Sequence, residues 1–319
     1  MKEETTITFL ASECGEFHGM GECIECTSLK EAFRQETIVK ETFEEASDLL
    51  GFSMENLCFE GNNQLNETKY TQPAILTVST AFLRVLRTKG YQADAVAGLS
   101  LGEYTALVAS GALAFSDAVQ LVHKRGQFMS EAATTGSGKM VAVMNTPAEI
   151  IEDCCKQASA LGIVSPANYN TPQQIVIGGE VAAVEKAEEL LQAAGTKRMI
   201  SLNVSGPFHT ALLEPASKRL NEVLQTITFN EMQVPVISNT TAEIMPQDQV
   251  VELLTKQVMS PVRFSDSIVT LKELGVSQLI EIGPGKVLTG FIKKIDRTLA
   301  TSRVEDVKTL AETVSFLGE

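Results

Sequence analysis

The 319-residue sequence has no tryptophan, only three histidines, and fewer basic than acidic residues. Its 26 Lys+Arg against 40 Asp+Glu give a formal net charge of −14. This deficit argues against a broad nucleic-acid or anionic-membrane surface, because phosphate groups are bound by clustered positive charge. We expect no nucleic acid and no membrane among the partners, and any polyanionic partner must meet a local basic patch.

Long apolar runs are also missing. No segment approaches the ~20 residues of a membrane span. The N-terminal stretch has one short apolar segment, Ile7 to Ala11, and lacks the apolar core of about 7–15 residues found in signal peptides. The chain is therefore expected to be cytoplasmic.

Cysteine is sparse, with six residues at positions 14, 23, 26, 58, 154 and 155. In a cytoplasmic chain these are expected to be mostly reduced thiols. Cys23 and Cys26 form a single C-x-x-C pair with no second pair and no histidine at metal spacing, so we expect no metal site. No glycine-rich nucleotide motif is complete, because Gly136-Ser-Gly-Lys139 lacks the upstream glycine of a P-loop.

What is present is an ordinary core-forming composition with strand–helix alternation. The sequence is 44% hydrophobic and 21% charged, which excludes a disordered chain. We predict a helix over 72–89 with Pro73 as its start signal, a strand over 94–98, a helix over 101–110, and a helix from Ser116 to about 133. This alternation predicts an α/β domain with a mainly parallel sheet.

Residues 138–204 follow a different pattern. Strands are predicted over 140–145, 163–168, 174–177 and 198–204, with helices over 147–160 and 181–194. The order β-α-β-β-α-β is that of a ferredoxin-like subdomain. We therefore predict a subdomain over 138–204, inserted into a discontinuous domain of residues 1–137 and 205–319; the alternative is that these elements continue the main sheet.

Gly98-Leu-Ser-Leu-Gly102 is the one G-x-S-x-G motif of the sequence. It lies between a predicted strand and a predicted helix, which is the context of a nucleophile elbow. Glycines allow strand and helix to approach closely at the strained turn, and the helix N-terminus favours developing negative charge. Ser100 is the candidate nucleophile; the alternative is a small-residue turn with a capping serine.

A serine nucleophile needs a base. His18 lies in a glycine-flanked N-terminal segment, and His123 lies off the apolar face of its helix, where we expect it to face solvent. His209 lies in a turn-rich loop after the inserted segment, a typical place for catalytic groups. His209 is therefore the preferred base, with His18 as the alternative.

Arg125 falls in the middle of the apolar face of the helix that follows Ser116. A guanidinium directed inward needs an acceptor, and a carboxylate matches its planar fork with two hydrogen bonds. That carboxylate could be a structural Asp or Glu or part of a substrate, and the spacing does not decide between them.

Seven short motifs occur in order along the chain: Thr71-Gln-Pro-Ala74, Gly98-Leu-Ser-Leu-Gly-Glu-Tyr104, His123-Lys-Arg-Gly126, Ala167-Asn-Tyr-Asn170, Gly206-Pro-Phe-His-Thr210, Ser260-Pro-Val-Arg-Phe264 and Glu281-Ile-Gly-Pro-Gly-Lys-Val287. From about residue 8 to 300 the chain resembles the malonyl-CoA:acyl-carrier-protein transacylases. The resemblance implies an α/β-hydrolase-like domain with an inserted ferredoxin-like subdomain. It also implies transfer of malonyl from malonyl-CoA to the phosphopantetheine of an acyl carrier protein through an acyl-serine, with no permanently bound cofactor.

The resemblance also implies roles for single residues. Ser100 is the nucleophile, His209 the base, and Arg125 the group that binds the malonyl carboxylate. The backbone carbonyl of Gln257 orients the histidine, and the backbone N–H of Leu101 provides half of the oxyanion hole. The remaining implied site residues are pocket residues that could instead serve the scaffold: Gln72 and Asn168.

One segment departs from the family pattern. The family usually reads Phe-Pro-Gly-Gln-Gly where this chain reads Leu10-Ala-Ser-Glu-Cys14. Glu13 therefore falls where a glutamine supplies the second oxyanion N–H. A carboxylate near the oxyanion would oppose it unless it points away or is neutral. Besides an active malonyltransferase of fatty-acid or polyketide synthesis, two alternatives follow: an acyl hydrolase acting on carriers, and an impaired homologue that binds carriers.

Overall fold

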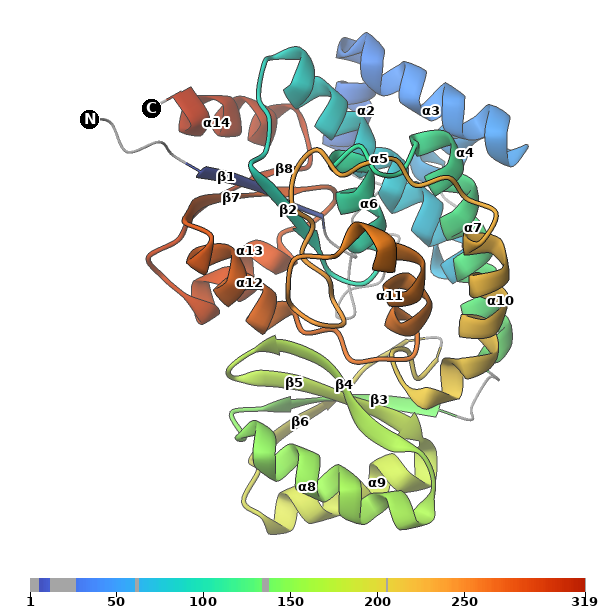
Figure 1. Ribbon diagram of the computed structural model, residues 1–319, viewed down its shortest axis with the longest axis vertical. Helices are drawn as coiled ribbons and strands as arrows, with labels where there is room; N and C mark the ends of the chain where they lie inside the picture. Colours follow the sequence, from blue (N-terminus) through green and yellow to red (C-terminus); the bar gives the residue numbers. More distant parts are fainter. Residues whose placement is uncertain (1–5, 12–26, 61–62, 134–137, 205, 319) are drawn as a thin grey trace.

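The computed structural model describes residues 6–11, 27–60, 63–133, 138–204 and 206–318, which contain two separate sheets (Figure 1). Sheet A has four parallel strands in the order β2-β1-β7-β8. Their bounds are β1 (Thr6–Ala11), β2 (Ala95–Gly98), β7 (Val276–Ile282) and β8 (Ala300–Val304). Because the strands are parallel, their C-terminal ends share one edge of the sheet, and the turn that contains Ser100 lies at that edge.

Both faces of sheet A are covered, as a parallel sheet requires. On one face, Phe9 packs in a core cluster that includes residues of α5 (Thr68–Thr88) and α6 (Gly102–Ala109). On the opposite face, the next residue, Leu10, packs with residues of α12 (Phe264–Glu273) and α13 (Val287–Ile295).

The remaining helices of the part that contains sheet A pack around α5 and α7 or against their neighbours. Helix α3 packs against α5 and α7, α2 and α4 pack against α3, and α10 packs against α7 (Figure 1). Their bounds, with those of two C-terminal helices, are α2 (Thr27–Gln35), α3 (Thr37–Leu50), α4 (Met54–Phe59), α7 (Phe115–Ala132), α10 (Glu214–Leu224), α11 (Val250–Gln257) and α14 (Val307–Gly318).

Sheet B is antiparallel, with the strand order β4-β5-β3-β6, and helices α8 and α9 lie on its outer face (Figure 1). Its elements are β3 (Gly138–Met144), α8 (Ala148–Ala158), β4 (Val164–Thr171), β5 (Gln174–Glu180), α9 (Val181–Ala193) and β6 (Arg198–Ser201). Edge strand β4 bonds to the segment before α12, where Tyr169 N donates to Val262 O and Val262 N donates to Ala167 O, both at 2.8 Å.

The α/β fold class with a mainly parallel sheet and a ferredoxin-like β-α-β-β-α-β segment is confirmed. The predicted alternative, in which residues 138–204 continue the main sheet, is wrong because sheet B forms no ladder with sheet A among the described strands. The division of the chain into 1–137 with 205–319 and 138–204 remains our proposal. The last strand of the segment is shorter than expected and ends at Ser201.

The predicted start of the helix at Gln72 is also wrong, because α5 begins at Thr68 and Pro73 lies inside it. Proline inside a helix removes the N–H that would bond the carbonyl four residues earlier. Here that carbonyl belongs to Lys69, and the His123 ring bonds it at 2.7 Å through Nδ1. The helix therefore continues through Pro73 because a side chain of α7 replaces the missing donor.

Candidate active site

Ser100 occupies a tight turn between β2 and α6. Its φ is 54°, in the left-handed region that L residues rarely adopt. A side chain at Gly98 would overlap the backbone of Gly102, so the close approach of strand and helix requires glycine there. The Asn239 side chain holds the turn, because Oδ1 accepts from Ser100 N at 2.6 Å and Nδ2 donates to Gly98 O at 2.5 Å.

His209 lies against the serine from the loop before α10. Its Nε2 is 2.8 Å from Ser100 Oγ, and its Nδ1 is 2.8 Å from the backbone oxygen of Gln257. Since a carbonyl can only accept, Nδ1 carries the proton and Nε2 is left to accept from the serine hydroxyl. Burial lowers the pKa of His209 to about 4, and the positive charge of Arg125 acts in the same direction. The imidazole is therefore neutral near pH 7 and can act as a base.

Arg125 is fully buried and points from α7 toward the same serine. Nη2 donates to Ser100 Oγ at 3.1 Å and to Gln257 Oε1 at 3.0 Å, while Nη1 donates to Gln72 Oε1 at 2.9 Å. Its Nε has no acceptor among the described residues, and the guanidinium lies 5.3 Å from the Tyr104 ring. All of these direct partners are neutral, and no described Asp or Glu forms an ion pair with Arg125.

Behind the serine, Gln257 and Glu103 join these groups into one buried network. Gln257 Nε2 donates to Ser100 O at 2.7 Å and to Glu103 Oε2 at 2.5 Å. The other Glu103 oxygen accepts from Asn239 N at 2.9 Å. Burial raises the pKa of Glu103 to about 7, opposed by these hydrogen bonds and by the positive charge of Arg125. A carboxylate three residues after the serine thus connects the Asn239 loop to the end of α11.

The two implied pocket residues are both buried but differ in their contacts. Gln72 contacts Arg125 and directs its amide nitrogen toward Met129 Sδ at 3.4 Å. Asn168 lies on β4 and is fully buried, yet neither Oδ1 nor Nδ2 has a hydrogen-bond partner in the part of the chain that is described. Asn168 therefore has free hydrogen-bond donors and an acceptor, whereas the Gln72 side chain is held by its hydrogen bond with the Arg125 guanidinium.

Of the two implied oxyanion donors, one lies within the described chain. Leu101 directly follows Ser100 at the start of α6 and is fully buried. Its N–H donates to no acceptor among the described residues, so it is available to an oxygen bound beside Ser100. Glu13 lies outside the described residues, as does His18, the alternative base.

The expectation that His123 faces solvent is wrong. The ring is half-buried between the Phe52 and Tyr70 rings, at centroid distances of 5.8 and 6.1 Å, and it bonds Lys69 O. The apolar pattern of α7 could not show this, because the reason lies in α5, where Pro73 leaves that carbonyl without a backbone donor.

Sequence reasoning missed Glu103 and Asn239. Glu103 had a signal comparable to that of Arg125, since it is the one charged residue in an otherwise apolar or small helix from Gly102 to Ala109. A charged residue on a buried helix needs partners, which predicts a polar network. Asn239 had no such signal, because it lies in a loop far along the chain and only the fold brings it to Ser100.

The described ranges contain no group of three or more His, Cys, Asp or Glu side chains able to hold a metal ion. Cys23 and Cys26 lie outside those ranges, while Cys58, Cys154 and Cys155 are buried free thiols. None of the described helices combines the length and apolar character needed to cross a membrane.

Comparison with known proteins gives consistent matches over nearly the whole chain. The sequence model of the acyl transferase domain family matches residues 17–313. A malonyl CoA-acyl carrier protein transacylase from Bacillus subtilis strain 168 is 44% identical over 307 residues, covering 95% of this chain and 94% of the relative. A crystal structure of MCAT from Streptococcus pneumoniae is 54% identical with a TM-score of 0.91, covering 98% and 100% of the two chains. A malonyl-transacylase in complex with its holo type II PKS acyl-carrier protein is 38% identical with a TM-score of 0.92, again covering 98% and 100%.

Proposed function

The chain belongs to the acyl transferase domain family, and from this premise we propose that it transfers malonyl from malonyl-CoA to an acyl carrier protein. The acceptor is the phosphopantetheine thiol of the carrier, and the acyl group passes through Ser100. Malonyl-CoA is a substrate, phosphopantetheine arrives on the partner, and no permanently bound cofactor takes part. A cytoplasmic location and a role in fatty-acid or polyketide synthesis belong to the same proposal.

The observation that carries the proposal is that the Arg125 guanidinium is buried and pairs with no carboxylate among the described residues. Its Nη2 lies 3.1 Å from Ser100 Oγ. A buried cation without an anionic partner is costly, and a bound carboxylate relieves that cost with charge-assisted hydrogen bonds. The sequence left open whether Arg125 pairs with a structural carboxylate or with the carboxylate of a substrate. Because no described Asp or Glu pairs with it, we propose that its partner is the substrate carboxylate. A neutral acyl chain would leave the cation unpaired, which disfavours a general acyl hydrolase.

In the first half-reaction His209 Nε2 takes the Ser100 hydroxyl proton as Oγ attacks the thioester carbon of malonyl-CoA. The oxygen of the tetrahedral intermediate accepts from the N–H of Leu101 and, by family resemblance, from that of Glu13. Collapse breaks the C–S bond, and the proton on His209 passes to the departing CoA thiolate. The Gln257 carbonyl keeps Nδ1 protonated and stabilises the imidazolium while it exists.

The second half-reaction reverses these steps with another thiol. His209 removes the proton of the phosphopantetheine thiol, whose sulfur attacks the malonyl ester carbon, and Ser100 leaves with the proton restored. Arg125 binds the malonyl carboxylate in both halves, with Gln72 supporting the guanidinium. Asn168, which has unused hydrogen-bonding capacity, is proposed as a pocket residue.

The test is transfer to the purified holo acyl carrier protein, followed by mass spectrometry of the carrier. We expect a malonyl mass increment on the phosphopantetheine arm with the wild-type protein, much slower acetyl transfer, and no transfer with Ser100→Ala. Release of free malonate without labelled carrier would show a hydrolase instead. Equal transfer of acetyl and malonyl would contradict the role given to Arg125.

A further inference from the structure

We propose that Glu103 is a positioning residue, whose carboxylate orients the side-chain amide of Gln257 so that the amide oxygen faces Arg125. The inference rests on the proposed function, because it concerns how the cation for the malonyl carboxylate is held. The carboxylate of Glu103 forms no hydrogen bond with Arg125 or with Ser100 among the described residues, and only its backbone N–H donates to Ser100 O, at 3.2 Å.

The Gln257 amide has donors on one side and acceptors on the other. Its oxygen accepts from Arg125 Nη2 at 3.0 Å, and its NH₂ group donates to Ser100 O and Glu103 Oε2. A guanidinium only donates, and a carboxylate or carbonyl only accepts, so the partners dictate this orientation. The reverse orientation would set NH₂ against the guanidinium and oxygen against two acceptors.

A carboxylate suits position 103 because the backbone N–H of Asn239 and the NH₂ of Gln257 can only donate to it, and the Ser238 side chain bonds it as well. Oε1 accepts from the backbone N–H of Asn239 and Oε2 from the NH₂ of Gln257. Glutamine has the same length but must present its own NH₂ to one of these donors, which leaves a buried donor unpaired. The glutamate therefore specifies the positions of the Asn239 loop and the Gln257 amide together.

The Gln257 amide also keeps the charges of Glu103 and Arg125 apart. Glu103 and Arg125 attract each other, as the effect of Arg125 on the pKa of Glu103 shows, but the Gln257 amide lies between them. A direct ion pair would occupy the guanidinium fork with a carboxylate of the protein itself. With the amide between them, the charge of Arg125 is partly compensated without a direct ion pair, and Nε, which has no acceptor among the described residues, is left for the substrate carboxylate.

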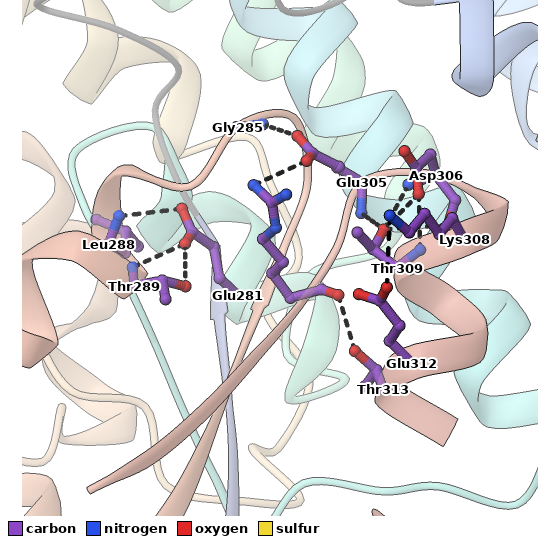
Figure 2. Close-up of polar contacts among 11 residues, drawn as sticks. Glu281, Gly285, Leu288, Thr289, Glu305, Asp306, Lys308, Thr309, Glu312 and Thr313 are labelled. Carbon is purple, nitrogen blue, oxygen red and sulfur yellow. Dashed lines mark hydrogen bonds and ion pairs between the residues drawn. The ribbon is translucent and has the colours of Figure 1, made fainter. Parts of the chain in front are cut away.

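The test compares Glu103→Gln with Glu281→Gln as a matched control. Glu281 is also a fully buried glutamate. Its carboxylate accepts hydrogen bonds from Leu288 N at 3.0 Å and from the N–H and hydroxyl of Thr289 at 2.7 and 2.6 Å (Figure 2). It caps the start of α13 and contacts no residue of the Ser100 network. Both variants remove one buried charge without changing side-chain length.

We measure kcat/KM for malonyl-CoA and acetyl-CoA, with carrier as acceptor, together with the melting temperature. Glu103→Gln should lower kcat/KM for malonyl at least about tenfold and for acetyl less than about threefold, so that the preference for malonyl falls. Glu281→Gln should lower the melting temperature and leave the preference unchanged. An equal loss with both donors in Glu103→Gln, or an unchanged preference, would overturn the proposal.

A second variant covers the case in which Glu103→Gln does not fold. Glu103→Asp keeps a carboxylate for the two donors but is one methylene shorter, so it cannot hold the Gln257 amide at the same place. We expect this variant to fold and to lose part of the malonyl preference, and a fully retained preference would overturn the proposal. Failure of the proposed function is distinguishable, because the wild-type protein would then show no malonyl preference to lose.

Discussion

At the scale of single residues, we propose that Arg125 sets the acyl-group specificity through charge. Arg125→Ala removes the partner of the malonyl carboxylate and leaves that group buried and unpaired, whereas acetyl has no such group. We expect kcat/KM for malonyl-CoA to fall roughly 10²-fold or more, about 1.4 kcal/mol per factor of ten, while acetyl transfer stays level or rises. Parallel assays with both donors and a melting curve check this. A large drop in melting temperature with both donors impaired alike would instead identify a structural arginine.

Two titratable groups at the site, His209 and Glu103, have pKa values that are shifted in opposite directions. His209, with a pKa lowered to about 4 by burial, stays neutral and active down to that pH. Glu103, with a pKa raised to about 7 by burial, protonates below pH 7 and then cannot accept from both of its donors. We predict that kcat/KM for acetyl-CoA is flat from pH 8 to about 5 and falls toward pH 4. For malonyl-CoA an additional fall begins near pH 7, and Glu103→Gln removes that additional step. Identical pH profiles for the two donors would contradict this assignment.

The same two pKa shifts also change the free energy of unfolding with pH, and they do so in opposite directions. The raised pKa of Glu103 contributes stability that is lost as pH rises from about 4.5 to about 7, because the unfolded carboxyl ionises first. The lowered pKa of His209 contributes stability that is lost as pH falls from about 6.5 to about 4, because the unfolded imidazole protonates first. The two contributions therefore oppose each other over the shared range.

The sequence led to the candidate site where a residue conflicts with its local pattern. Ser100 followed from the glycine spacing, and Arg125 followed from its place on an apolar helix face. Glu103 carries the same kind of signal as Arg125, whereas Asn239 has none because a tertiary contact alone brings it to the turn. The roles of all these residues remain predictions.

At the scale of elements, the α5–α7 contact positions the cation. Arg125 reaches Gln72 on α5, and two residues before Arg125 on α7, His123 bonds Lys69 O. A side chain at Gly126 would lie 2.5 Å from Thr68 O, so glycine allows the helices to approach. Sequence patterns predicted both helices but not their contact, because the donor that Pro73 removes is replaced from another helix.

His123→Ala should therefore destabilise the protein, by about 1–2 kcal/mol for a part-buried carbonyl left without its donor. Urea unfolding measures this, and Lys124→Ala, an exposed neighbour on α7, should stay within about 0.5 kcal/mol of the wild type. Pro73→Ala returns a backbone N–H to Lys69 O, so His123→Ala should cost less in that background. Equal costs in both backgrounds would show that the ring acts by packing alone.

At the scale of the whole molecule, the net charge of −14 makes docking of an acidic partner depend on local basic groups. Five exposed basic residues form no ion pair within the described chain: Lys197, Arg198, Lys286, Lys293 and Lys294. We expect an acyl carrier protein, as an acidic partner, to be attracted to such groups.

Charge reversal of Lys197 and Arg198 should raise KM for the carrier, with a steeper effect at low ionic strength, and leave slow hydrolysis of malonyl-CoA unchanged. Lys156→Glu on α8, across sheet B, is the matched control. Steady-state kinetics at several salt concentrations would measure the effect. Equal changes with carrier and with malonyl-CoA hydrolysis would show that the reversal disturbs the site itself.

The central claim is that malonyl passes through Ser100, and intact-protein mass spectrometry after mixing with malonyl-CoA tests it most directly. The account predicts one malonyl increment, mapped to the peptide containing Gly98–Gly102, absent in Ser100→Ala and formed roughly 10²–10⁴-fold more slowly in His209→Ala. Adding holo carrier should remove the increment from the enzyme and transfer it to the carrier. A malonyl label on a cysteine, or transfer to carrier by Ser100→Ala, would contradict the account.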